Sequence, residues 1–364
     1  MASKSENVQS QSTFKKRHIK IAAGNTLVAT PVFDTYWRFA TMRQDIFMQR
    51  VVGEQPPFTT DPVLSVHRFT NAYRASDRVS QYLIRNVLYD GDQSTEEVFF
   101  RAMLFKIFNR IDTWETLNKK IGFPTWKTYK FEQYARVFDE IMDGGKTLYS
   151  AAYIMPSPAF GNPRKHRNHL RLIEYMMKNK LPKQVANAKT LSDVFNTLLD
   201  CPSLGAFLAF QFTIDLNYSS IIDFPESQFV VAGPGAKDGI RKCFADTGGL
   251  TEAEVIHAVT EMADAEFKRL GLSFKTLWGR PLQPIDCQNI FCEVDKYARV
   301  MHPEFIGNSG RSRIKQKFHT NFQPLPQWYP PKWKLKLPKK IVSAIGDDLS
   351  ERERVAAADI MSAL

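Results

Sequence analysis

The feature that most constrains the fold is an apolar stretch, residues 198–216, that a proline and a glycine interrupt. Pro202 and Gly205 divide it into two runs, which predicts a helix, a tight turn and a second helix that begins at about Ala206. We expect Gly205 to take the left-handed dihedral angles of the turn. The free backbone amides at the start of the second helix would then form a seat for a phosphate. The alternative interpretation is a buried helix pair that binds no ligand.

The composition is that of a folded protein with a large core. The chain has 364 residues, of which 43% are hydrophobic and 24% are charged. No apolar run is long enough to span a membrane, and the N-terminus lacks the apolar segment of a signal peptide. Four cysteines occur without a Cys-x-x-Cys pair, which favours reduced thiols and argues against a zinc or iron–sulfur site. We therefore expect a cytoplasmic protein, monomeric, with no metal, no cofactor and no membrane contact.

Two basic blocks indicate the kind of partner. No acidic residue occurs between residues 305 and 346, where nine Lys or Arg residues fall, and the block 164–189 has one acidic residue. Trp328, Tyr329 and Trp333 interleave with the first block, and cations beside aromatic faces suit a nucleic acid. The alternative is a solvated basic surface. The cations of the first block that we expect to bind DNA are Arg311, Arg313, Lys315 and Lys317.

Hydrophobic periodicity predicts a mainly α fold. The expected helices are residues 32–51, 95–108, 114–121, 129–142, 168–180, 191–200 and 251–270. A short strand is expected over 229–232, directly before a glycine-rich helix start in which Gly233, Gly235 and Lys237 form a second candidate anion cradle. The expected organisation is a disordered tail (1–13), a helical domain (14–304), for which two lobes around a cleft are one arrangement, and a basic C-terminal extension (305–364).

A nucleotide-binding loop is excluded. The run Gly144-Gly145-Lys146-Thr147 would need a further glycine five residues before Gly145, and that position is Glu140. We therefore expect no ATP binding.

The pattern Pro202-x-Leu204-Gly205-x-x-x-Ala209 resembles the hairpin of the helix-hairpin-helix DNA glycosylases, with Ser203 where those enzymes usually carry glycine. The resemblance implies a glycosylase-like helical fold in which Ser203 and Gly205 contact DNA. Glycosylases that also cleave the strand keep a lysine just after the turn, and Phe207 fills that place here. The resemblance thus implies a monofunctional enzyme, with Lys237 as the matching lysine only in an alternative register.

The run from Arg68 to Leu83 resembles the helical domain of phage 5-hydroxymethyluracil DNA kinases. The same domain occurs in the α-glutamyl/putrescinyl-thymine pyrophosphorylases, a branch placed within the glycosylase superfamily, and the resemblance extends over about residues 33–299. It implies that Asn71 lies near the base. Asp77 follows Arg74 by three residues, which permits a local ion pair. The residues that we expect to form the base pocket are Asn71, Arg74, Asp77, Arg78, Glu293 and Lys296.

Three aspartates are candidates for catalysis. Glycosylases of this superfamily place an aspartate at a helix start after a proline and an apolar residue, and Pro284-Ile285-Asp286 has that form. A fixed carboxylate there would stabilise the positive charge that builds on the sugar. An ordinary helix cap is the alternative. Because Asp286 lies far beyond the hairpin, Asp223 or Asp215 could instead take the role.

These expectations lead to one hypothesis about function and two alternatives. The first is a DNA glycosylase that flips a bulky modified pyrimidine out of double-stranded, phage-type hypermodified DNA and excises it, leaving an abasic site, in anti-phage defence. The first alternative is a DNA base hypermodification enzyme that exchanges an activated thymine substituent for an amine. The second alternative is a DNA-binding module without chemistry.

Overall fold

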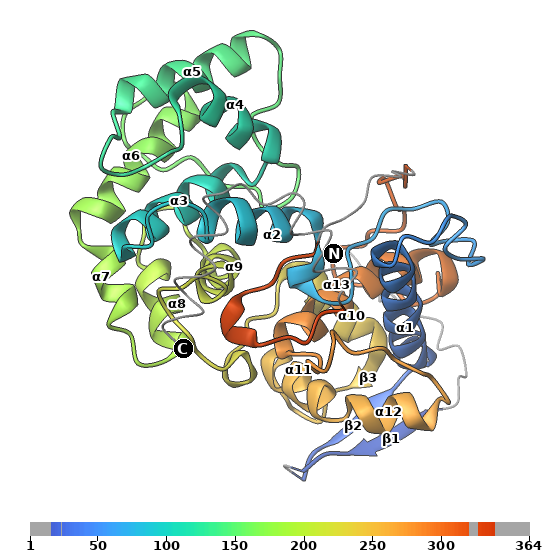
Figure 1. Cartoon of the computed structure of the whole chain (residues 1–364). Coiled ribbons are helices and arrows are strands. Elements are labelled where there is room, and N and C mark those ends of the chain that lie inside the picture. Colours follow the sequence, from blue (N-terminus) through green and yellow to red (C-terminus); the bar gives the residue numbers. More distant parts are fainter. Residues whose placement is uncertain (1–15, 23, 320–326, 339–364) are drawn as a thin grey trace, which may run out of the picture.

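Thirteen α-helices and one small sheet make up the described part of the chain (Figure 1). The computed structural model describes residues 16–22, 24–319 and 327–338. The predicted tail of residues 1–13 and the cations Lys339 and Lys340 lie outside these ranges. The mainly α fold class is confirmed.

The helices pack in two groups, and the chain starts in the second group, passes through the first and then returns (Figure 1). The first group consists of α2 (Arg78–Leu83), α3 (Thr95–Phe108), α4 (Ile111–Ile121), α5 (Phe131–Asp143), α6 (Lys165–Lys178), α7 (Leu181–Ala186), α8 (Leu191–Leu199) and α9 (Ala206–Asn217). The second group consists of α1 (Pro31–Val51), α10 (Pro234–Cys243), α11 (Glu252–Glu261), α12 (Ala263–Arg269) and α13 (Pro284–Met301).

Four short helical turns connect or flank these groups. They are η1 (Arg74–Ser76), η2 (Ile84–Leu88), η3 (Glu226–Gln228) and η4 (Pro331–Trp333). Of these, η1 lies where the groups meet, because its residues contact α13 of the second group and precede α2 of the first.

The sheet joins the start of the described chain to its middle. The strands β1 (Arg17–Lys20), β2 (Thr26–Ala29) and β3 (Phe244–Asp246) are antiparallel in the order β1-β2-β3. Directly after β2, the amide of Thr30 donates a 2.9 Å hydrogen bond to the carbonyl of Cys243, the last residue of α10. This connection fixes the start of α1 against α10.

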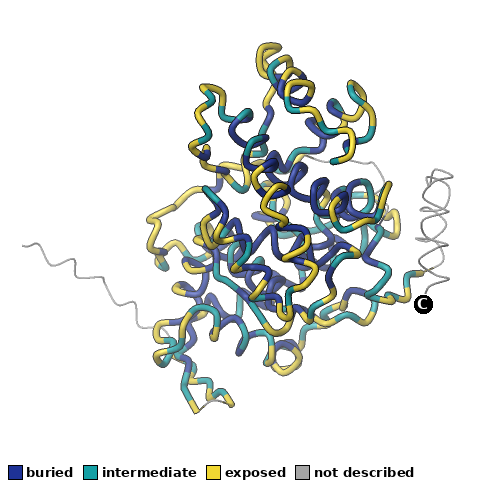
Figure 2. The backbone as a smooth tube through the Cα atoms, turned by 90° about the vertical axis from the view of Figure 1, so that its left-hand side faces the viewer, coloured by how far each residue is buried: buried dark blue, intermediate teal, exposed yellow. Residues whose placement is uncertain are grey.

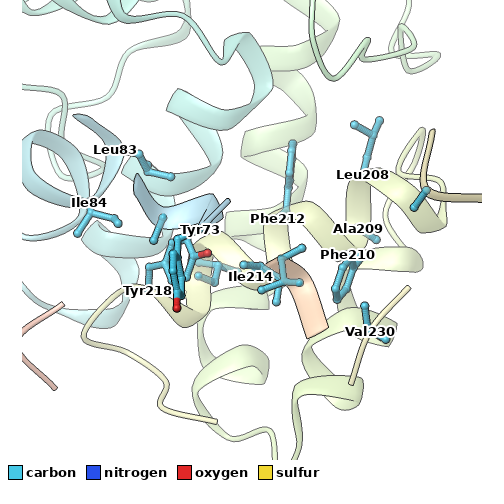
Figure 3. Packing of buried hydrophobic residues seen from close by; sticks show 14 of the residues in the cluster. Tyr73, Leu83, Ile84, Leu208, Ala209, Phe210, Phe212, Ile214, Tyr218 and Val230 are labelled. Carbon is cyan, nitrogen blue, oxygen red and sulfur yellow. The ribbon is translucent and has the colours of Figure 1, made fainter. Parts of the chain in front are cut away.

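Helix α9 is buried on every side, at the centre of the first group. Its residues Leu208 to Asn217 are all buried, and Phe210, Phe212 and Ile214 have no exposed surface. Figure 3 shows these side chains among Leu83, Ile84 and Tyr218, and Figure 2 shows buried backbone running through the middle of the molecule. A wholly buried helix has apolar residues on every side, as α9 does, and its buried polar residues are Gln211, Thr213, Asp215 and Asn217. No helix in the described ranges is long and apolar enough to cross a membrane.

The turn between α8 and α9 is built differently from the expectation. Gly205 has φ of −77° and ψ of 167°, which any residue adopts, and it is the N-cap of α9. The left-handed residue is Ser203, with φ of 65°. The prediction that Gly205 would supply the left-handed conformation is therefore wrong, because the chain reverses two residues earlier.

Most of the expected helices have bounds within three residues of the prediction, and two other expectations fail. The expected helix 251–270 is divided at Met262 into α11 and α12. The expected strand 229–232 is an extended segment without strand partners, in which the Phe229 ring lies 5.2 Å from Phe195 and 5.9 Å from Phe210 between ring centroids. Packing against helices α8 and α9 thus replaces pairing in a sheet.

The segment 327–338, called the C-terminal strap below, packs against η1 and against α2 and the end of α9 in the first helix group. The Tyr329 hydroxyl lies 2.7 Å from the Ser76 hydroxyl of η1, and Gln81 of α2 accepts a 2.7 Å hydrogen bond from the Trp328 amide. The Lys332 amino group donates to the carbonyls of Asn217 and Ser219, at 2.6 and 2.8 Å, at the end of α9. The strap therefore satisfies backbone acceptors that the end of α9 leaves open.

Candidate functional site

A cavity of about 530 Å³ lies between the two helix groups. Both groups line it, and so does the loop that contains η1. The lining residues used below are Arg68, Thr70, Arg74, Arg78, Asn109, Arg110, Tyr153, Phe207, Gln211, Gly233, Gly235, Gln288, Asn289, Cys292, Glu293, Lys296 and Gln316. A cavity of this size, at the junction of two structural units and with several polar groups, is typical of a ligand site.

Arg74 is the buried cation of this cavity. It is 3% exposed, yet its side chain lines the cavity. Its Nη1 donates to Asp215 Oδ1 at 2.8 Å, and its Nε donates to Gln211 Oε1 at 3.0 Å. Burial is the largest influence and opposes the charged guanidinium, but Asp215, with smaller contributions from Tyr218 and Tyr153, raises the pKa of Arg74 well above its ordinary value. The predicted local ion pair of Arg74 with Asp77 is wrong, because the guanidinium turns toward α9.

A second buried cation, Lys106 of α3, shares the same carboxylate. Its Nζ lies 2.8 Å from Asp215 Oδ2 and 3.1 Å from Asn109 Oδ1. It also lies 4.4 Å from the centre of the Tyr153 ring, which stacks on Phe207. Burial lowers the pKa of Lys106. Burial alone would raise the pKa of Asp215, but Arg74 and Lys106 outweigh it and keep the carboxyl pKa below its usual value.

The opposite wall of the cavity comes from α13. Glu293 accepts a 2.9 Å hydrogen bond from the Thr70 amide and forms a 2.7 Å ion pair with Lys296. Asn289 donates to the Thr70 hydroxyl at 3.1 Å and to the Asn71 carbonyl at 3.0 Å. These contacts fix the loop that carries η1 against α13.

Two predicted pocket residues, Asn71 and Asp77, lie outside the cavity lining. Arg43 donates a 2.8 Å hydrogen bond to Asn71 Oδ1, and Asn71 Nδ2 donates a 2.8 Å hydrogen bond to the Ser76 carbonyl. Asp77 accepts a 2.8 Å hydrogen bond from the Asn71 amide, and burial raises its pKa to about 7. Both side chains are engaged in holding the loop, so neither is available to contact a base in this conformation. The other four, Arg74, Arg78, Glu293 and Lys296, do line the cavity.

The three candidate aspartates have three different environments. Asp286 is the third residue of α13; it accepts hydrogen bonds from the Gln283 and Arg74 amides at 3.0 and 2.8 Å, and burial raises its pKa to about 7. Its carboxylate caps the helix and does not line the cavity, contrary to the expectation that it faces a cleft. Asp215 is enclosed in its ion pairs. The Asp223 side chain is 72% exposed and lies 3.7 Å from Lys332. None of the three presents a carboxylate to the described cavity.

The glycine-rich start of α10 forms part of the lining. A Cβ atom at Gly233 would come within 2.6 Å of the Phe207 ring, and one at Gly235 would collide with Cys292 Sγ. Glycine therefore allows α10 to approach both α9 and α13. Lys237 lies outside the lining; its side chain is 51% exposed and lies 3.6 Å from Glu252.

Ser203 and Gly205 also lie outside the lining, at the turn before α9. Gly205 is exposed, and nothing stands within 4 Å of the position of a Cβ atom there. The contact of this turn with DNA stays a prediction.

The first part of the basic extension lies at the rim of the cavity. The Arg68 amide donates a 3.1 Å hydrogen bond to the Gln316 carbonyl, and the Phe318 amide donates a 3.0 Å hydrogen bond to the Val66 carbonyl. Arg68 and Gln316 both line the cavity. The predicted DNA-binding cations flank this pairing and are exposed: Arg311, Arg313, Lys315 and Lys317.

The aromatic residues of the extension have a structural role. Tyr329 is 6% exposed, and its ring stacks on Trp333 with ring centroids 6.0 Å apart. Trp328 packs edge-on against Tyr89, and the Arg280 guanidinium lies 3.8 Å from the centre of the Trp333 ring. The expectation that these rings stack on nucleic acid is corrected for the described conformation, because they pack inside the domain.

Sequence reasoning missed several polar residues of the site: Lys106, Asn109, Arg110, Gln211 and Gln288. One signal was present for Lys106. It interrupts a run that is otherwise apolar all round, Met103-Leu104-Phe105-Lys106-Ile107-Phe108, and a buried cation needs a partner. Within the described residues, no group of three or more His, Cys, Asp or Glu side chains is placed to hold a metal ion.

Fold and site together define a mainly helical domain with a polar, cation-lined cavity between two helix groups. A family model described as "5-hmdU DNA kinase, helical domain" matches residues 30–307, and the chain belongs to this family. It is similar to a protein named 5-hmdU DNA kinase from Bacillus phage SP10, with 26% identity over 286 residues. The match covers 73% of this chain but 45% of the relative, so the chain spans about half the length of that relative. No solved structure matches the chain.

These comparisons overturn the predicted glycosylase function. The family and the relative are named for a DNA kinase, which is a transferase, whereas excision of a base would require a hydrolase of the glycosidic bond. Base flipping, an abasic product and an excision-based anti-phage role were predicted from that activity and lose their support with it. The comparisons agree better with the first alternative, a DNA base hypermodification enzyme.

Proposed function

We propose that this domain binds DNA containing a 5-substituted pyrimidine and acts on the substituent at C5, leaving the glycosidic bond intact. The observation that carries the proposal is the cavity of a 5-hmdU DNA kinase helical domain, with a buried arginine and a lysine-paired glutamate among its lining residues. The substituent at C5 projects into the major groove, as the thymine methyl group does. A group there is accessible from outside the duplex.

The reaction that we propose is exchange of an activated substituent for an amine. The bond between the C5 methylene carbon and the leaving group breaks, and the leaving group keeps the electron pair. The amine nitrogen forms the new bond to that carbon and loses one proton. Glu293 is the residue that we assign to accept this proton, because it lines the cavity and lies within a 2.7 Å ion pair with Lys296.

DNA itself would lie over the rim of the cavity. Arg68, Arg78 and the exposed cations near Gln316 surround the opening from two segments of the chain, and cations of this kind bind phosphates of any sequence. We include the turn at Ser203 and Gly205 in this surface. A hairpin there in contact with the backbone would also support the proposed kinship with the helix-hairpin-helix superfamily.

The test uses the full chain with DNA from phages of different base chemistry, and with plain thymine-containing DNA. After incubation with an amine, the DNA is digested to nucleosides and analysed by mass spectrometry. We expect nucleosides altered at the C5 substituent, together with tighter binding to the modified DNA. Free base with abasic sites, or equal binding to thymine-containing DNA, would contradict the proposal. If the protein binds the DNA but no nucleoside is altered, the DNA-binding module without chemistry is the one hypothesis that remains.

A pair of glutamates provides the matched variants. Glu293 and Glu174 are both buried, at 7% and 9% exposure, and each forms an ion pair within its own helix. We expect Glu293→Gln to reduce formation of the altered nucleoside at least tenfold with DNA binding retained. Glu174 lies outside the cavity lining, so Glu174→Gln should leave formation of the altered nucleoside unchanged.

A further inference from the structure

A buried cluster that reaches the cavity through Arg74 has two cations in contact with one carboxylate. Arg74 and Lys106, each 3% exposed, share the single carboxylate of Asp215, at 2.8 Å from both. The other carboxylates that act electrostatically on Arg74 are Asp77 and Glu226, and both are bonded elsewhere: Asp77 accepts from the Asn71 amide, and Glu226 pairs with Arg280 at 2.8 Å. Asp286 bonds to the Arg74 backbone amide rather than to its guanidinium. Burying a charge that no opposite charge balances is strongly unfavourable. A surplus of this kind beside a cavity indicates an anionic ligand.

Asn109 adds a hydrogen-bond donor at the same place. It is 5% exposed, lines the cavity and closes α3 in a left-handed conformation with φ of 48°. Because a lysine amino group only donates, the 3.1 Å contact with Lys106 Nζ must involve the amide oxygen of Asn109. The amide nitrogen, Nδ2, then has no acceptor among the described residues and faces the cavity that Asn109 lines.

Arg110 adds a further donor without an acceptor. Its Nη2 forms a 2.7 Å ion pair with Asp112, but its Nε is buried and lacks a partner among the described residues. Arg110 follows Asn109 directly and lines the same cavity. The end of α3 thus offers two unmatched donors beside the surplus charge.

We infer that this end of the cavity is an oxyanion subsite that binds a phosphoryl group, with Arg74 and Asn109 as its ligands and Lys106 as the positioning residue that orients Asn109. A phosphate oxygen accepts hydrogen bonds only from donors, and it brings the negative charge that the Arg74–Asp215–Lys106 cluster lacks. Cys292 and Glu293, on the opposite wall, would then face the rest of the ligand.

The phosphoryl group has two possible sources, and naming them rests on the proposed function. It is either a phosphodiester of the DNA backbone or a phosphoryl group carried by the C5 substituent of the pyrimidine. Competition separates the two. A thymine-containing oligonucleotide displaces inorganic phosphate in the first case, whereas only an oligonucleotide with a phosphorylated 5-hydroxymethyl group does so in the second.

The decisive variant is Asn109→Asp. Aspartate also tolerates the left-handed conformation, so the turn is kept. Its carboxylate would neutralise the surplus charge and would replace the free donor with an acceptor. We expect the fold to be as stable as that of the wild type or more stable, and the affinity for inorganic phosphate to fall at least tenfold. Isothermal titration calorimetry and thermal unfolding at constant ionic strength would measure both.

The control is a second buried lysine. Lys242 forms a 2.8 Å ion pair with Asp295, which Arg299 also contacts, so this cluster has the same charges but does not line the cavity. Lys106→Met should weaken phosphate binding at least tenfold, and Lys242→Met should not. Wild-type phosphate affinity in Asn109→Asp, or equal stabilisation by chloride and phosphate, would overturn the inference. The phosphate titration uses no DNA, so its outcome is independent of whether the DNA reaction occurs.

Discussion

Asp286 Oδ1 accepts a 2.8 Å hydrogen bond from the backbone amide of Arg74, which joins the start of α13 to η1. The other carboxylate oxygen accepts the Gln283 amide at 3.0 Å. One aspartate therefore caps a helix and holds the buried arginine of the cavity in place. The carboxylate that was expected to stabilise a sugar cation thus bonds to two backbone amides, one of them that of Arg74, a lining residue of the cavity.

The first prediction concerns the pH dependence of stability. The pKa of Asp286 is raised by burial to about 7, from an unfolded value of 3.8. The folded protein thus binds the proton more tightly, so the contribution to stability is complete below about pH 4 and is lost as the pH rises through 7. The slope approaches about 1.4 kcal/mol per pH unit at most. Urea unfolding between pH 4 and 8 should show a smaller slope for Asp286→Asn than for the wild type. Equal slopes would mean that the group titrates normally.

The second prediction compares two other aspartates. Asp215→Asn would leave Arg74 and Lys106 without a counterion in the core, and breaking a buried ion pair costs about 3–5 kcal/mol. Asp223→Asn changes an exposed side chain and should stay within about 0.5 kcal/mol. Denaturant unfolding measures both. A similar small loss in the two variants would show that the buried cluster contributes little.

The third prediction concerns the contact between α10 and α13. A Cβ atom at Gly239 would collide with the backbone carbonyl of Phe291, which cannot rotate away. Gly239→Ala should therefore cost about 1–3 kcal/mol or more through overpacking. Gly205→Ala has open space around it and a common backbone conformation, so it should be neutral within about 0.5 kcal/mol. The thermal unfolding midpoints of the two variants test this prediction. A Gly239→Ala protein as stable as the wild type would mean that α10 and α13 lie further apart than described.

The fourth prediction concerns the rim cations. Replacing Arg311, Arg313, Lys315 and Lys317 with glutamine should weaken DNA binding and reduce the slope of log K against log salt by about 0.9 for each DNA phosphate that these side chains neutralise in the wild type. The comparison variant changes Lys178, Lys180, Lys183 and Lys189, which are exposed on and after α6 and α7 and do not line the cavity. If only the second set of substitutions weakened DNA binding, the DNA would lie over α6 and α7 and not over the rim of the cavity. Point changes are preferable to truncation, because the strap that follows is part of the core.

Periodicity and turn residues were sufficient to predict most helices. The bounds of α3, Thr95–Phe108, match the expectation, because its apolar residues continue on all sides until Asn109 reverses the chain. The extended segment 229–232 shows where local patterns fail. Its β-branched and aromatic residues suit a strand, but a strand also needs a partner, and here Phe195 and Phe210 occupy that side.

The cavity was only partly predictable, for a physical reason. Local sequence patterns pointed to Arg74, Glu293 and Lys296, which do line the cavity, whereas Asn71, which the family resemblance implied, does not. The partners of Arg74, Gln211 and Asp215, follow it by 137 and 141 residues. No short-range pattern encodes such a pairing, because it arises only when α9 packs against η1. The same holds for Lys106 and Asn109.

The C-terminal strap changes where the folding unit ends. The family match stops at residue 307, yet Tyr329, Lys332 and Trp333 lie against η1, the end of α9 and Arg280. A recombinant fragment cut at the homology boundary would uncover Tyr218, 1% exposed in the full chain, and would leave the carbonyls at the end of α9 open to water. Fusion partners and affinity tags should therefore follow residue 338. If a fragment of residues 30–307 were insoluble, the cause would be the loss of the C-terminal strap and not an unstable family fold.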